Sequence, residues 1–138
     1  VQRLMRTHDV LLCPTLDESL GWVIVEAAMA GMPVVTTDVF AIPELVLNEE
    51  TGFLIPISKN ELRRWVGLWL DGPAFDEEVA RTFIALQDGL AAAVLRFAAN
   101  PSLIVKMGAA AKRHIDSLYA RPVAQRQLEL IYAAALER

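Results

Sequence analysis

The sequence has only one cysteine and two histidines among its 138 residues. A single cysteine cannot form an internal disulfide, and Cys13 stands in an apolar run before Pro14. This position predicts a buried thiol in a reducing compartment rather than a catalytic one. His8 and His114 are predicted to be surface or partly buried side chains.

Basic residues and long apolar runs are also scarce. The 13 Lys and Arg residues against 17 Asp and Glu residues give a net charge of −4, which argues against a dedicated nucleic-acid surface. We find no signal peptide and no uninterrupted apolar run of about 18 residues, the length of a membrane-spanning helix. We therefore predict a cytoplasmic protein. The 54% share of apolar residues excludes disorder and predicts extensive burial.

The N-terminal part predicts alternating strands and helices. The apolar run 10–13 indicates a buried strand, residues from about 20 or 21 to 30 favour a helix that Gly31 ends, and the β-branched run 34–37 indicates a second strand. Such a strand–helix–strand unit predicts parallel strands and right-handed winding. A short helix at 42–46 and a third strand at 53–55 follow.

Beyond residue 58 the pattern is helical, and Ser58 with Glu61 has the form of a capping box. Helices are predicted at about 59–70, 76–99, 102–118 and 122–137. Three strands make a small parallel sheet, because doubly wound domains usually have five or six. We therefore predict that the chain, which begins with Val1, is the C-terminal part of a larger α/β domain and of a larger enzyme.

Glu26 is the only charged residue between Ser19 and Thr37. A buried carboxylate needs a partner, so either another part of the protein or a ligand rich in hydroxyl groups should meet it. A pairing with an arginine elsewhere in the protein is the plainer alternative. Glu18 precedes the predicted helix, roughly 8 Å of helix away from Glu26, although beside Asp17 it also fits a solvated acidic loop.

The start of this predicted helix is suited to phosphate. Helix N-termini present free N–H groups and a positive dipole end, and Gly21 lets a ligand approach the backbone closely. Two carboxylates on either side of a phosphate-binding terminus are suited to a nucleotide sugar, whose hydroxyl groups flank a diphosphate.

The spacing of Glu18 and Glu26, eight residues apart, resembles the E-x7-E motif of the retaining GT-B glycosyltransferases related to sucrose synthase and glycogen synthase, the group 1 glycosyl transferases. Five segments match the same family in register: DVLL with Pro14, ESLG at 18–21, EAAMAGMPVV at 26–35, IPELV at 42–46 and TGFL at 51–54. The resemblance covers residues 1–57 well and the C-terminal helices loosely.

The resemblance implies an α/β fold, the C-terminal part of a Rossmann-like GT-B domain with a short parallel sheet and several C-terminal helices. It implies that Glu26 accepts hydrogen bonds from the ribose of the donor. It also implies that Glu18 is the catalytic residue that faces the donor sugar and supports the positively charged transition state. Ser19 and the backbone of Leu20 and Gly21 would complete the donor site.

The family also implies what accompanies this site. The partners are a nucleotide-diphosphate sugar and an N-terminal domain of the same enzyme, and neither a metal nor a cofactor is needed. The family's cations for the diphosphate come from an upstream Arg/Lys pair, whereas residues 1–57 hold only Arg3 and Arg6. We therefore predict that this polypeptide alone transfers no sugar. The alternative is a non-catalytic nucleotide-sugar-binding or scaffold module.

Residues 1–138 are thus predicted to form one partial donor-binding domain, with an α/β region at 1–57 and a helical region at 58–138. Within it, 58–86 is an insertion relative to the family. Trp65, Trp69 and Phe75 there are predicted to pack on the sheet rather than to cover an acceptor or membrane-facing surface. Trp22 and Met29 are assigned to a buried helix face. An exposed apolar stripe on the last helix leaves a dimer contact or a peripheral membrane acceptor open.

Overall fold

A computed structural model describes residues 2–5, 7–119 and 121–136. Three strands, β1 (Leu11–Cys13), β2 (Val34–Thr37) and β3 (Gly52–Ile55), form one parallel sheet in the order β1-β2-β3. All three lie where the sequence predicts strands. The first residue of β3 is a glycine because a Cβ on Gly52 would stand 2.1 Å from the carbonyl oxygen of Val34.

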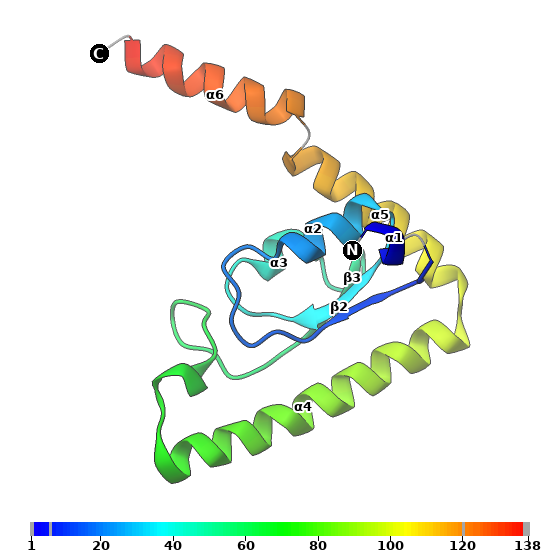
Figure 1. The fold of residues 1–138 in the computed structure, drawn as a ribbon, viewed down its shortest axis with the longest axis vertical. Coiled ribbons are helices and arrows are strands. Elements are labelled where there is room, and N and C mark those ends of the chain that lie inside the picture. The colour runs from blue at the N-terminus through cyan, green and yellow to red at the C-terminus, as the bar shows by residue number, and fades with distance from the viewer. Residues whose placement is uncertain (1, 6, 120, 137–138) are drawn as a thin grey trace.

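Helices cover both faces of this sheet. Figure 1 shows α2, α3 and α5 on one side and the long α4 across the other, while α6 leads away beyond α5. The helices are α1 (Gln2–Met5), α2 (Trp22–Met29), α3 (Ile42–Leu45), a 3-10 turn η1 (Val66–Trp69), α4 (Gly72–Ala99), α5 (Ser102–Tyr119) and α6 (Arg121–Leu136). The predicted end of the last helix at 137 lies outside the described residues. The predicted α/β class with a short parallel sheet and C-terminal helices is confirmed.

The core is built around β2, which is buried along its whole length. Ile24 and Val25 of α2 reach it from one side, and Ala93 and Phe97 of α4 close the other side. The Phe97 ring lies 5.1 Å from that of Phe53, centroid to centroid. A sheet buried on both faces explains why β1 and β2 consist of nearly continuous apolar and β-branched residues.

The predicted end of α2 at Gly31 is confirmed. Gly31 has a φ of 76°, and the N–H of Met32 returns to the carbonyl of Ala27 at 2.9 Å. This left-handed closure favours glycine. Gly108 of α5 permits a close approach to this turn, because a Cβ on Gly108 would stand 1.9 Å from the Gly31 carbonyl oxygen.

The predicted helix at 59–70 is wrong. Residues 60–64 form a turn in which the Asn60 side-chain oxygen accepts the N–H groups of Leu62 and Arg64, both at 3.0 Å. A side chain that satisfies nearby N–H groups competes with helix formation. The capping box does not form either, because no helix begins directly after Ser58, whose backbone carbonyl accepts the N–H of Val66 at 3.2 Å.

α4 begins at Gly72, four residues before the prediction, because Pro73 is compatible with the first turn of a helix. Among the described helices, α4 is the one long and apolar enough to cross a membrane by length and composition, and 22% of its most apolar stretch is buried. Its inner face packs on the core through Leu86, Ala93 and Phe97. Within this fold, α4 serves as the cover of one sheet face.

Candidate functional site

The loop that follows β1 is fixed to the neighbouring strand at the carboxyl edge of the sheet. The hydroxyl of buried Thr36 donates to the carbonyl of Cys13 at 2.8 Å, and that of buried Thr37 donates to the carbonyl of Thr15. Two buried hydroxyl groups are thereby satisfied, as buried polar groups must be. The two threonines give the loop that carries Glu18 a defined starting direction.

Glu18 lies in this loop, half-buried, beside the start of α2. Its Oε1 accepts the N–H of Ser19 at 2.9 Å, and its Cγ lies 3.6 Å from where a Cβ on Gly21 would stand. Burial raises the pKa of the Cys13 thiol, and the nearby Glu18 charge raises it further. The Glu18 carboxylate therefore stands where β1 ends and α2 begins, as the sequence predicts.

Gly21 precedes α2 with a φ of 82°, and no side chain caps this helix end. Its carbonyl accepts the N–H groups of Ile24 and Val25 at 2.9 and 3.2 Å. The uncapped first turn faces the Glu18 loop. A helix terminus of this kind carries a partial positive charge that favours an anion.

The expected burial of Glu26 is wrong. Glu26 is exposed, and it shares one stripe of α2 with Trp22 and Met29, which are 64% and 53% exposed. The assignment of these two residues to a buried face is therefore also wrong. The buried face of α2 instead carries Ile24, Val25, Ala27 and Ala28. Glu26 needs no protein partner, and it lies on the solvent side one turn along the helix from Trp22.

The buried carboxylate of the described chain is Glu78 on α4, which is 3% exposed. It accepts hydrogen bonds from Arg81 at 2.6 Å and from the Thr82 hydroxyl at 3.2 Å. Thr82 in turn accepts the indole N–H of Trp65 at 2.9 Å. The sequence did not reveal the burial of Glu78, because Asp76 and Glu77 precede it and the acidic run resembled a solvent-exposed helix start.

Two cations reach the carboxyl edge from the segment after β3, and both were missed by sequence reasoning. Lys59 forms an ion pair with Asp38, and Arg64 forms one with Asp17, next to Glu18. The Arg64 guanidinium also lies over the Phe40 ring, 5.5 Å from its centroid. The sequence carried no local signal for these contacts, because Arg64 and Asp17 are 47 residues apart.

The aromatic residues of the 58–86 insertion differ in their environments. Trp65 is buried in the core, as predicted, and packs edge-on against Phe75, with ring centroids 6.1 Å apart. Trp69 and Phe75 are 57% and 37% exposed, so the packing prediction is wrong for these two residues.

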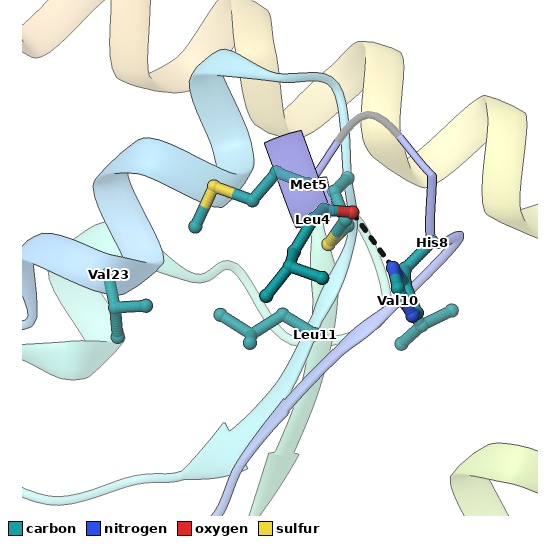
Figure 2. Close-up of a pocket in the computed structure, with 7 residues that line it drawn as sticks. Leu4, Met5, His8, Val10, Leu11 and Val23 are labelled. Carbon is teal, nitrogen blue, oxygen red and sulfur yellow. Dashed lines mark hydrogen bonds between the residues drawn. The ribbon is translucent and has the colours of Figure 1, made fainter. Parts of the chain in front are cut away.

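An apolar cavity of about 320 Å³ lies away from Glu18, at the start of β1. Figure 2 shows its lining from α1, β1 and α2, with His8 Nδ1 within 2.9 Å of the Leu4 carbonyl oxygen. The lining residues are Leu4, Met5, His8, Val10, Leu11, Val23 and Met32. Its apolar walls offer little to a charged ligand. In the part of the chain that the structure describes, no group of three or more His, Cys, Asp or Glu residues could hold a metal ion.

Comparison with known proteins relates the chain to glycosyltransferases. The family model of the Glycosyl transferases group 1 matches residues 1–66. A D-inositol 3-phosphate glycosyltransferase of Streptomyces avermitilis is 31% identical over 132 residues, 96% of this chain and 22% of that protein. The alpha-maltose-1-phosphate synthase of Mycolicibacterium smegmatis is 34% identical over 61 residues, 44% of this chain and 16% of that protein.

A solved structure extends the likeness to the whole fold. Sucrose-phosphate synthase from Thermosynechococcus elongatus superposes with a TM-score of 0.68 at 22% identity, covering 97% of this chain and 27% of that one. The chain spans no more than about a fifth of the curated relatives described above, 22% and 16% of their lengths.

Proposed function

Because the chain belongs to the group 1 glycosyl transferases and has a GT-B type of fold, we propose that its carboxyl edge helps to bind a nucleotide-diphosphate sugar. The observation that carries the proposal is the position of Glu18. Its half-buried carboxylate stands beside the uncapped start of α2, at the end of a parallel strand. Ligands of open α/β sheets bind at such an edge.

The residues divide the donor between them. The first turn of α2, with the backbone of Leu20 and Gly21, takes the diphosphate through N–H groups and the helix dipole. Glu26, exposed one turn along the helix, accepts hydrogen bonds from the ribose hydroxyl groups. An exposed carboxylate is better placed for this role than a buried one, because its acceptor sites are open to a ligand.

Glu18 supplies the electrostatic part of the chemistry. Its negative charge at the donor sugar stabilises the positive charge that develops as the bond to the leaving diphosphate breaks. Ser19 holds the Glu18 side chain through its backbone N–H. Transfer then proceeds with retention of the anomeric configuration, with the acceptor hydroxyl attacking from the side of the leaving group, and no enzyme nucleophile is assigned.

The test is calorimetric titration of the full-length enzyme with UDP- and GDP-sugars. Glu18→Ala and Glu26→Ala should each weaken donor binding by on the order of tenfold or more, because each removes charge-assisted hydrogen bonds. Glu50→Ala is the matched control, an exposed carboxylate in the turn before β3. Unchanged donor affinity and turnover in both site variants would show that the donor site lies elsewhere.

The 138-residue chain by itself should transfer no sugar. Two of the cations near the carboxyl edge, Lys59 and Arg64, are already paired with Asp38 and Asp17. A diphosphate needs cations or many N–H donors, so the chain requires charge from other parts of the enzyme. Incubation with nucleotide sugars and acceptors checks this, and measurable transfer contradicts it.

The second candidate is a nucleotide-sugar-binding module without catalysis. The two candidates differ in one measurement on the full-length protein. Donor binding that depends on Glu18, without turnover on any acceptor, supports the second candidate.

A further inference from the structure

A short turn after β3 covers the carboxyl edge beside Glu18. We call residues 58–65 the cap. Its ends meet in an antiparallel bridge between Lys59 and Trp65, and Asn60 closes it from within. The carbonyl of Arg63 accepts the N–H of Phe40 at 2.6 Å, which fixes the cap to the loop after β2.

The base of the cap is anchored in the core. Trp65 is 5% exposed, and its indole N–H donates to the Thr82 hydroxyl on α4 at 2.9 Å. Thr82 and Arg81 both donate to buried Glu78. Since buried polar groups of this kind are costly to leave unpaired, the network holds the base of the cap in one position relative to α4.

Arg64 lies in the cap directly before Trp65. It binds Asp17 in the loop after β1 and lies over Phe40 in the loop after β2. Within the described part of the chain, its buried Nε has no hydrogen-bond partner. A planar guanidinium that stacks on a ring and binds a carboxylate loses much of its rotational freedom. Arg64 therefore joins the two loops that border the start of α2.

We propose that Arg64 is a positioning residue for Glu18, acting through Asp17. Thr37 fixes the start of the Glu18 loop at Thr15, and Gly21 fixes its end at α2. Arg64 restrains the middle of the loop at the residue before Glu18. Its positive charge also offsets the adjacent Asp17 and Glu18 carboxylates, which would otherwise repel each other. The link to sugar transfer rests on the proposed function.

The loop itself gives the first test, on the 138-residue chain without any donor. Arg64→Gln should raise amide hydrogen exchange at Thr15 and Ser19, measured by NMR, by about five- to tenfold. That is the size expected for losing one exposed ion pair and one cation–π contact. Arg64→Lys keeps the charge and should restore part of the protection. A thermal melt by circular dichroism checks that each variant is folded.

The matched control is Arg96→Gln. Arg96 also pairs with a carboxylate, Glu49 at 2.7 Å, and lies over a ring, Phe53 at 4.4 Å. It stands at the opposite end of β3 and should leave the Thr15 and Ser19 exchange unchanged. Equal exchange in Arg64→Gln and the unsubstituted chain, or an equal increase in Arg96→Gln, overturns the positioning role.

The second test separates this inference from the proposed function. In the full-length enzyme, Arg64→Gln should raise the donor KM by about the factor by which it raises the amide exchange rate. Arg64→Lys should raise the KM less, and Arg96→Gln should leave it unchanged. If Arg64→Gln increases the amide exchange but neither Glu18→Ala nor Arg64→Gln changes the donor affinity, the proposed donor site is refuted and the restraint of the loop by Arg64 is supported. If Glu18→Ala weakens donor binding but Arg64→Gln does not, the link between Arg64 and Glu18 is overturned.

Discussion

The two ends of the small sheet carry the same kind of side-chain cluster for different purposes. In each, an arginine binds a carboxylate and lies over an aromatic ring. The carboxyl-edge cluster consists of Arg64, Asp17 and Phe40, and the amino-edge cluster consists of Arg96, Glu49 and Phe53.

The difference lies in what each cluster joins. Arg96 connects α4 to the turn and strand that it already covers, so it adds to existing packing. Arg64 connects the cap to the loops after β1 and β2, and the loop after β1 carries Glu18. Interactions of the same kind therefore add to the packing at one edge and, in our proposal, restrain the loop that carries Glu18 at the other.

The largest expected effect is the loss of the cap's anchor. Trp65→Ala removes a buried aromatic side chain and its bond to Thr82, which should cost about 3–5 kcal/mol of unfolding free energy. It should also increase exchange at Ser19, because the cap loses its base. Chemical denaturation measures the first effect. Trp69→Ala, at 57% exposed, is the control and should stay within about 0.5 kcal/mol.

The next effect belongs to the amino edge, where α2 and α5 cross. Gly108→Ala places a Cβ against the Gly31 carbonyl, 1.9 Å away without adjustment, and should cost about 2–3 kcal/mol. Unlike Trp65→Ala, it should leave the relative exchange of the Glu18 loop unchanged. Exposed Lys106→Ala on α5 is its control. A neutral Gly108→Ala would mean that the two helices are not in close contact.

Local signals account for what the sequence predicted correctly. The β-branched residues of β2 and the stop at Gly31 each act through their own backbone, so no distant contact is needed to read them. The helix at 59–70 was predicted wrongly because helical propensity there is weaker than the local hydrogen bonds of Asn60. The pattern around it did not reveal that competition.

The sequence predicted where the candidate site lies, but it did not predict which charged side chains are exposed or paired there. Glu18 follows from the strand–loop–helix order. Glu26 was expected to be buried, but in an eight-residue helix with apolar residues on both faces the exposed stripe is decided by tertiary packing. The pairing of Arg64 with Asp17 depends on how the chain returns to this edge after β3. Sequence spacing contains no information about such a return.

A third substitution pair compares the hydroxyl groups that fix each edge. Thr37→Val deletes the bond to the Thr15 carbonyl, and Thr51→Val deletes the oxygen that accepts the Leu47 N–H at 2.8 Å. Each leaves a partner unsatisfied and should cost about 1–2 kcal/mol in denaturant unfolding. Only Thr37→Val should also raise the exchange of Ser19. If Thr37→Val and Thr51→Val raised the Ser19 exchange equally, the carboxyl and amino edges would not differ in how they hold the Glu18 loop.

The smallest expected effect tests the position of the Glu18 charge directly. Burial first, and then the Glu18 carboxylate, raise the pKa of Cys13. Removal of that charge in Glu18→Gln should lower the pKa, increase the thiolate fraction at a fixed pH near 8, and speed alkylation by iodoacetamide. We expect about a two- to threefold increase, because one pKa unit corresponds to a tenfold change in thiolate.

Glu26→Gln is the matched control for this reaction, because it removes the same charge from the exposed stripe of α2. Its alkylation rate should equal that of the unsubstituted chain, since burial and the Glu18 charge are what raise the Cys13 pKa. Equal acceleration by both substitutions would mean that the thiol responds to overall charge. The Glu18 carboxylate would then not stand at the end of β1, and the carboxyl edge would lose the residue that distinguishes it from the amino edge.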